Sequence, residues 1–209
     1  MDKALGNDDF PHDRVVFFSD AVFAIAITLL VIEIRIPDHA AVAKIGVGGA
    51  LSTLMPLFIA YVVSFLVTSL FWASHLQTWK HVTTVTGGLV WLNVFQLLFV
   101  ALMPFSTGYY SEYFGSNASF TFYCLNLAAI ASFAYFMRAY VIRREGLEEK
   151  LGTAQVAWMK QRSLTAVFVF LACIPLAYWQ PWLGRSGFLL IFAIHGLLKR
   201  HHRLKAEAA

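Results

Sequence analysis

The sequence predicts an all-α integral membrane protein with six transmembrane helices in each subunit. Of its 209 residues, 59% are hydrophobic and only 13% are charged. The mean hydropathy is +0.65, and the apolar residues collect in long runs that a soluble protein has too few polar residues to cover. The lipid bilayer is therefore the expected solvent of this chain.

Six runs have the length and composition of membrane spans. A helix crosses the hydrocarbon core with roughly 20 apolar residues, because its backbone polar groups must be paired within the segment. Asp13 is expected to cap the first span and Pro37 to stop it. The spans, which we assign to a single membrane domain over residues 1–209, cover approximately 15–36, 50–75, 88–105, 120–140, 164–179 and 187–198.

The basic residues are distributed unequally between the two sides that six spans define. Thirteen of the sixteen Lys and Arg residues fall in or beside the N-terminus, the second and fourth loops and the C-terminus, and the other three are Arg35, Lys44 and Arg185. Cytoplasmic segments of membrane proteins carry this excess. We therefore predict a multi-pass protein of the cell membrane with both termini cytoplasmic. The net charge of +4 needs no nucleic-acid partner.

Ionisable and polar residues stand at the start of the first span. Arg14, Ser19 and Asp20 precede an otherwise apolar run, and an ionisable group at membrane depth costs roughly 2.5–3.5 kcal/mol on insertion scales unless it has a partner. Trp72 and His75 near the cytoplasmic end of the second span are expected at a similar depth, where they can hydrogen-bond Ser19 and Asp20. The alternative is that both rings are interfacial anchors. Trp79 is expected in the interfacial aromatic belt.

These residues resemble a known family. Arg14, Phe18, Ser19 and Asp20 form the sequence R-x-x-x-F-S-D, and Trp72 with His75 forms W-x-x-H. Together they resemble the prokaryotic members of the transmembrane protein 175 family, relatives of the lysosomal potassium channel. The resemblance implies a homotetramer in which the first helix of each subunit lines a central pore for monovalent cations, with potassium as the permeant ion and the motif residues as structural supports. It implies an apolar narrow point and no cofactor.

Helical geometry identifies candidate pore residues on the first span. At 100° per residue, Ile25, Leu29 and Ile32 fall within about 60° of one another along roughly 10 Å of helix. Three apolar layers of this kind around a symmetry axis can form a dewetting constriction. Thr28 borders the stripe and offers one hydroxyl group to a passing ion. Judged by periodicity alone, the stripe also fits a lipid-facing or packed surface.

Phe18 and Ile36 are expected to continue this face, whereas Ser19 and Asp20 point away from it by roughly 100° and 160°. Asn93 and Gln96 share a face of the third span and are interpreted as interhelical hydrogen-bonding residues.

Other classes of function lack their sequence signatures. The chain has no H-E-x-x-H, no G-x-S-x-G and no intramembrane pair of aspartates, so an enzyme is not expected. It also has no T-V-G-Y-G loop, so selectivity among monovalent cations need not come from a cage of carbonyl oxygens. Cys124 and Cys173 lie in apolar stretches without metal-ligand spacing. The sequence thus favours a potassium-permeable cation channel, with a secondary transporter or a proton-permeable channel of the same fold as the alternatives.

Overall fold

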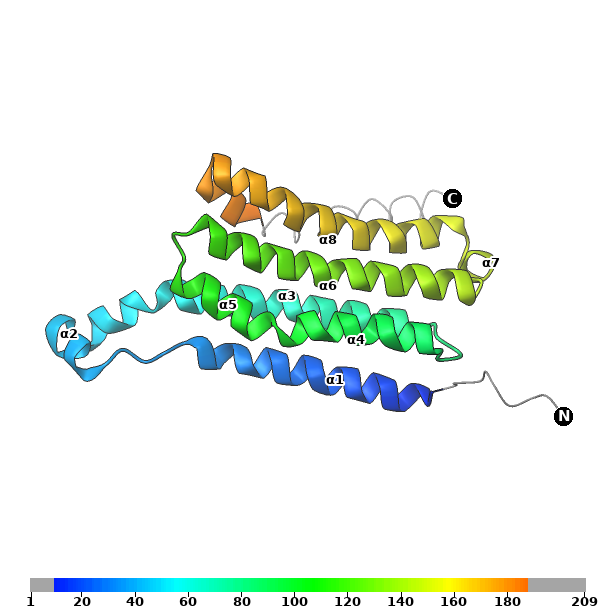
Figure 1. Cartoon of the computed structure of the whole chain (residues 1–209), viewed down its shortest axis with the longest axis horizontal. Coiled ribbons are helices and arrows are strands. Elements are labelled where there is room, and N and C mark those ends of the chain that lie inside the picture. The colour runs from blue at the N-terminus through cyan, green and yellow to red at the C-terminus, as the bar shows by residue number, and fades with distance from the viewer. Residues whose placement is uncertain (1–9, 188–209) are drawn as a thin grey trace, which may run out of the picture.

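The computed structural model describes residues 10–187 as a bundle of long helices (Figure 1). Within this range there is no β-strand, only a single antiparallel bridge between Phe10 and Val85. The sixth predicted span, 187–198, lies outside the described residues except for Gly187. Five helical segments of the described part are long and apolar enough to cross a membrane, and they cover His12–Glu33, Val42–Trp79, Gly87–Glu112, Asn117–Arg144 and Thr153–Trp179.

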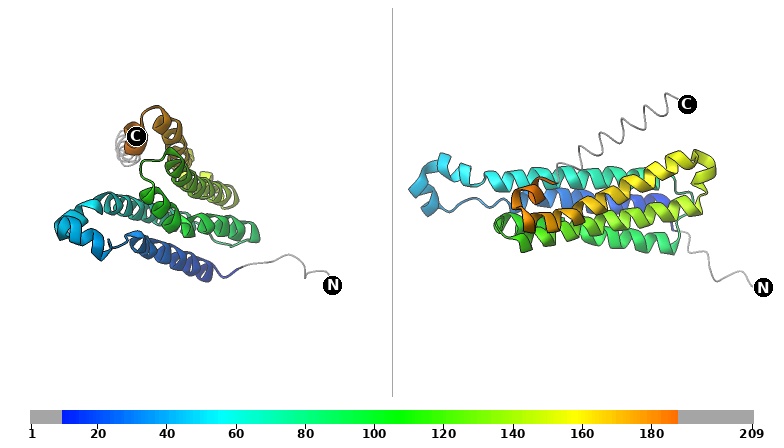
Figure 2. Two further views of the ribbon diagram at one scale, coloured as in Figure 1. Left: turned by 60° about the vertical axis from the view of Figure 1, so that its left-hand side comes forward. Right: turned by 90° about the horizontal axis from the view of Figure 1, so that it is seen from above.

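The five segments run antiparallel along the long axis of the molecule (Figures 1 and 2). Helix α1 (His12–Leu29) packs against α3 (Met55–Trp79) and α4 (Gly87–Ala101) at one edge of the bundle. Helix α6 (Asn117–Arg144) is central, because it contacts α3, α4, α5 (Met103–Glu112) and α8 (Thr153–Trp179). The start of α1, the α3–α4 turn and the short α7 (Leu147–Leu151) gather at one end, and α2 (His39–Thr53) lies at the other. We call the α7 end the basic end.

Helix α1 begins and ends differently from the prediction. Its N-cap is Pro11, and Asp13 lies inside the first turn, where a carboxylate interacts favourably with the helix dipole without capping. The helix tightens into the 3₁₀ turn η1 (Leu30–Glu33), and the next residue, Ile34, is extended. The first span therefore ends three residues before Ile36 and does not reach Pro37.

Proline accounts for the break in the third segment, which was predicted to end at residue 105. Pro104 occupies the first turn of α5, a position where its missing N–H costs no helical hydrogen bond. Leu102 separates α4 from α5, and the chain then continues helically to Glu112.

The other described spans also differ in their bounds from the predicted ones. The fifth segment begins at Thr153 rather than 164, because Lys160 and Arg162 are helical residues whose long side chains reach polar partners. Lys160 Nζ lies 3.1 Å from Glu148 Oε1, and Arg162 Nη1 donates to Gln77 Oε1 at 3.2 Å. Helix α3 runs from 55 to 79 instead of 50 to 75, and α6 from 117 to 144 instead of 120 to 140.

A polar contact joins the two turns at the basic end. Thr83 in the α3–α4 turn donates its backbone N–H to Glu145 Oε1 at 3.0 Å and its hydroxyl to Oε2 at 2.7 Å. Partial desolvation raises the pKa of Glu145, but these hydrogen bonds and the nearby Lys150 together outweigh it and hold the pKa below its ordinary value. The carboxylate thus fastens the start of α4 to the end of α6.

Candidate functional site

Helix α1 presents two different faces. Phe23, Ala26 and Leu30 are at most 2% exposed and pack into the bundle. On the other face Ile25, Leu29 and Ile32 are 58%, 40% and 67% exposed. We call these three residues the α1 stripe. Because α1 lies at the edge of the bundle (Figure 1), the stripe is available to lipid or to a second subunit.

The 3₁₀ turn at the end of α1 keeps Ile32 in line with Leu29. Side chains three residues apart eclipse one another in a 3₁₀ helix, whereas they are about 60° apart in an α-helix. Ile32 therefore lies nearly above Leu29 along the helix axis. Ile36 is 89% exposed but follows the extended Ile34, so helical geometry no longer relates it to the stripe.

Thr28 borders the stripe and is exposed. Its hydroxyl donates to the carbonyl oxygen of Ile25 at 2.9 Å. A hydroxyl oxygen that has given its proton to the backbone still carries lone pairs. Thr28 can thus act as an oxygen ligand beside the stripe, with its orientation fixed by the helix.

A chain of buried hydrogen bonds connects α1, α4 and α3. Asn93 Nδ2 donates to Ser19 Oγ at 2.9 Å, and Asn93 Oδ1 lies 2.9 Å from His75 Nε2. Trp79 Nε1 donates to the same His75 nitrogen at 2.8 Å. All four side chains are at most 2% exposed. Because one imidazole nitrogen cannot donate to Asn93 while accepting from Trp79, the His75 tautomer and the Asn93 amide orientation are coupled.

Asp20 has a separate partner. Its Oδ1 accepts a hydrogen bond from Trp72 Nε1 at 2.8 Å. Asp20 is half-buried and Trp72 is exposed on the outside of the single subunit. The structure therefore divides the polar residues of the first span into a buried arm through Ser19 and an outer arm through Asp20.

The remaining motif residues are not drawn into these contacts. Phe18 is 59% exposed. The Arg14 side chain is exposed, and it has no hydrogen-bond partner among the residues that the structure describes. His75 reaches Ser19 only through Asn93, so the direct imidazole contact expected from the sequence is absent from the described network.

Two residues play roles that the sequence did not indicate. Trp79, expected at the membrane interface, is 2% exposed and hydrogen-bonded to His75. Arg138, counted among the basic cytoplasmic residues, is 3% exposed inside α6. The signal for Arg138 was its position inside the apolar run 120–140, where an ionisable residue needs partners. In the described part of the chain, no three His, Cys, Asp or Glu side chains gather where they could hold a metal ion.

Comparison with known proteins shows that part of the first half of the chain is similar to a known family. Residues 14–104 match the family model described as the endosomal/lysosomal potassium channel TMEM175. A curated relative from Streptomyces collinus, named a potassium channel, is 40% identical over 122 residues, which cover 56% of this chain and 58% of the relative. The human protein named endosomal/lysosomal proton channel TMEM175 is 36% identical over 104 residues, covering 47% of this chain and 21% of the relative. The chain thus spans at most about three-fifths of these relatives.

A solved structure extends the similarity to nearly the whole chain. The crystal structure of a lysosomal potassium-selective channel TMEM175 homolog from Chamaesiphon minutus superimposes with a TM-score of 0.78 at 25% sequence identity. The match covers 90% of this chain and 97% of that chain. The similarity therefore includes the helices after residue 104, which the family model does not reach.

Proposed function

Because the chain is similar to TMEM175 channels in sequence and in fold, we propose that it is one subunit of a homotetrameric, potassium-permeable cation channel in the cell membrane, with α1 lining the pore and with both termini cytoplasmic. The observation that carries this proposal is the α1 stripe. Its three apolar side chains are exposed in the single subunit, while the opposite face of the same helix is packed. The bacterial relatives that are named as potassium channels support potassium as the permeant ion.

Symmetry explains how a stripe at the edge of one subunit becomes the wall of a pore. In a closed ring every subunit presents the same surface to the axis. If α1 is the innermost helix, rings of Ile25, Leu29 and Ile32 follow one another along that axis. Such rings offer no oxygen to replace an ion's hydration shell, so a narrow ring excludes both water and ions until it widens. The α1 stripe is therefore proposed as the constriction, with Ile25 nearest the cytoplasm.

The hydrogen bonds of Ser19 and Asp20 are proposed to hold α1 at the rotation that turns the α1 stripe towards the pore axis. Ser19 and Asp20 contact α4 and α3 from the side of α1 that does not carry the stripe. These contacts resist rotation of α1 about its own axis. Permeant ions would meet Thr28 rather than Ser19, Asp20 or His75.

A proton-permeable channel of the same fold is the second candidate. The human relative carries the name of a proton channel. The α1 stripe contains no titratable side chain, so protons would need a water column through the same constriction. A secondary transporter is the remaining alternative, and it would show flux that saturates and depends on a coupling ion.

The cation current through purified protein reconstituted into liposomes tests the proposal. Ile25→Asn and Leu29→Asn supply hydrogen-bonding groups to the constriction, so we expect a larger and less selective cation current than in the wild type. Ile27→Asn and Val31→Asn make the same chemical change away from the stripe and should leave the current nearly unchanged. Bi-ionic recordings with K⁺, Na⁺ and H⁺ then identify the permeant ion.

Two outcomes would contradict the proposal. Equal currents from the stripe variants and the controls would show that this face does not line the conduction path. No cation flux from well-folded wild-type protein would remove the channel assignment itself.

A further inference from the structure

An open groove separate from α1 lies between α4 and α6 at the basic end of the bundle. Its volume is about 510 Å³, which is within the range of small-molecule sites, roughly 300–1,000 Å³. One face of α6 and one residue of α4 line it, and these residues are Leu92, Phe136, Ala139, Tyr140, Arg143 and Arg144. No residue of α1 is among them, so the proposed pore does not account for this groove.

Two arginines line the end of the groove that is nearest to the end of α6. Arg143 and Arg144 are exposed and occupy the last turn of the helix. Neither side chain makes a hydrogen bond or an ion pair with any residue in the part of the chain that the structure describes. The next residue, Glu145, directs its carboxylate to Thr83, and neither of these lines the groove. The two guanidinium groups are thus available to an anion from outside the chain.

The N-terminus of α4 adds positive potential at the same place. Thr86 is the N-cap residue of this 15-residue helix, but its hydroxyl lies 2.8 Å from Tyr140 Oη and does not cap the first turn. A Cβ atom added at Gly88, in that first turn, would lie 3.7 Å from the same Tyr140 oxygen. Tyr140 lines the groove, so the positive end of the α4 dipole borders it. Helix dipole and guanidinium charges therefore both favour an anion there.

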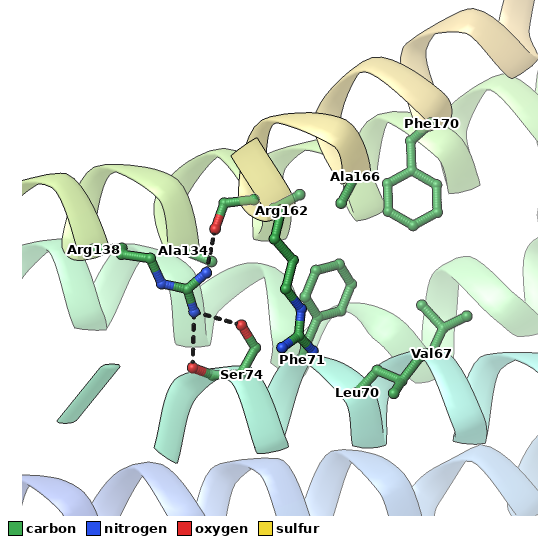
Figure 3. A pocket seen from close by; sticks show the side chains of 11 residues that line it. Val67, Leu70, Phe71, Ser74, Ala134, Arg138, Arg162, Ala166 and Phe170 are labelled. Carbon is green, nitrogen blue, oxygen red and sulfur yellow. Dashed lines mark hydrogen bonds between the residues drawn. The ribbon is translucent and has the colours of Figure 1, made fainter. Parts of the chain in front are cut away.

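The third arginine of α6 has a different role. Arg138 is 3% exposed and points towards α3 and α8, where its guanidinium donates to Ser74 (Figure 3) and to Ser163. These acceptors, together with others from the same helices, use its donors inside the bundle. Arg138 does not line the groove between α4 and α6. The positive charge of the groove is therefore that of Arg143 and Arg144.

The groove becomes apolar with distance from the arginines. Ala139 and Phe136 line the deeper part, and from Arg144 to Phe136 the groove follows roughly 12 Å of helix. Aromatic rings continue this surface, because Phe136 contacts Phe133 with ring centroids 6.2 Å apart, and Phe133 stacks on Phe95 of α4 at 5.5 Å. A phospholipid of this leaflet has its phosphate and its acyl chain in the same order, whereas a free anion would contact the arginine end alone.

We propose that this groove binds an anionic phospholipid of the leaflet at the basic end, with its phosphate at Arg143 and Arg144 and an acyl chain along Phe136 and Phe133. Guanidinium groups match the geometry and charge of a phosphate, and basic pockets between membrane helices bind anionic head groups. Two positive charges without a carboxylate beside an apolar wall favour a lipid over a face of a second subunit. The lipid joins the start of α4 to the end of α6, independently of the proposed conduction path.

Lipid retention tests this site in the full-length protein. The protein is purified from membranes that contain equal amounts of phosphatidylglycerol and phosphatidylcholine, and the bound lipid is measured by native mass spectrometry. Arg143→Gln and Arg144→Gln should each lower the ratio of retained phosphatidylglycerol to phosphatidylcholine by about fivefold, because each removes one charge near the lipid phosphate. Arg143→Lys keeps the charge and should lose less.

Matched controls make the result specific. Lys80→Gln removes an exposed charge at the same end of the bundle but outside the groove, so it should leave the ratio unchanged. Phe136→Ala removes part of the apolar wall, and Ala139→Phe fills the groove, both without a change of charge. Both variants should lower the retention of long-chain phosphatidylglycerol. Inorganic phosphate in large excess should not displace the lipid.

Each opposite result would overturn the proposal. Equal losses in the arginine variants and in Lys80→Gln would show unspecific attraction to the basic end. Unchanged retention in both Phe136→Ala and Ala139→Phe would show that no acyl chain lies in the groove. Displacement by inorganic phosphate would assign the arginines to a free anion. A disulfide between subunits through Phe136→Cys would place a second subunit in the groove instead of a lipid.

Discussion

Trp72 donates its indole N–H to the carboxylate of Asp20 at 2.8 Å, and this hydrogen bond fastens α3 to α1 at the outer surface of the subunit. The buried arm through Ser19 and Asn93 fastens the same part of α1 from inside. Helix α1 is thus held on two sides near its middle, while its stripe is left exposed. The predictions below test this arrangement and its surroundings.

Asp20→Ala should weaken the oligomer more than it alters ion preference. The variant removes a hydrogen bond to a charged group, worth roughly 1.5–3 kcal/mol, and frees α1 to rotate at the proposed subunit interface. Size-exclusion chromatography in detergent should show less oligomer, and Trp72→Phe should act in the same direction. Asp13→Ala, at an exposed carboxylate, is the matched control. An intact oligomer with a changed K⁺/Na⁺ permeability ratio would instead place Asp20 in the pore.

Asn93→Leu should destabilise the folded subunit. The change removes the buried amide contacts to Ser19 and His75, at a cost of about 0.5–1.5 kcal/mol for each lost hydrogen bond, while Ser19 keeps its bond to Val15 and His75 keeps its bond from Trp79. The denaturation midpoint in detergent measures the effect. Gln155→Leu changes an exposed amide on α8 and should cost little. Equal midpoints for the two variants would show that the buried arm adds no stability.

Glu33→Gln should reduce potassium conductance at low ionic strength, by roughly twofold, if carboxylates at the end of α1 attract cations to the pore mouth. Glu33 follows Ile32 and packs against α5, where a Cβ atom added at Gly108 would collide with its carboxylate. Salt screens exposed charges, so the difference should vanish near 1 M KCl. A reduction that persists at high salt would indicate a structural effect rather than attraction.

The Glu145–Thr83 contact should make stability depend on pH. Hydrogen bonding lowers the pKa of Glu145 in the folded protein, so its contribution is present above the unfolded pKa of about 4.5 and is lost as the pH falls through the folded pKa. Wild-type protein should therefore lose more stability than Glu145→Gln when the pH is lowered from about 6 to about 3. The effect should be small because the side chain is near the surface. Glu149→Gln, at an exposed position on α7, is the control and should lose as much stability as the wild type over the same pH range.

Single cysteines at Lys3 and Lys205 should react with a membrane-impermeant maleimide only from the cytoplasmic side. The basis is the excess of Lys and Arg in the segments assigned to that side. The native Cys124 and Cys173 are at most 3% exposed, so their background labelling should be low. Labelling of intact cells from outside would reverse the proposed orientation.

Composition and run length were sufficient to predict a helical membrane protein, because burial of backbone polar groups in lipid leaves few alternatives to long apolar helices. The motif in the first two spans was sufficient to predict the resemblance to TMEM175 channels, which the comparisons confirm. Helix ends were predicted less well. Lys160 and Arg162 were assigned to a loop, although long basic side chains can extend from a membrane helix to polar partners.

Helical periodicity predicts the direction in which a side chain leaves its own helix, but it does not predict which residue of another helix that side chain will contact. The sequence could therefore predict that Ser19 and Asp20 point away from the α1 stripe, and it could suggest Trp72 and His75 as partners. Only the packing of α4 beside α1 and α3 decided that Asn93 stands between Ser19 and His75. Likewise, Arg138 became a buried cation only because α3 and α8 both close over α6, since burial depends on neighbours that are distant in the chain.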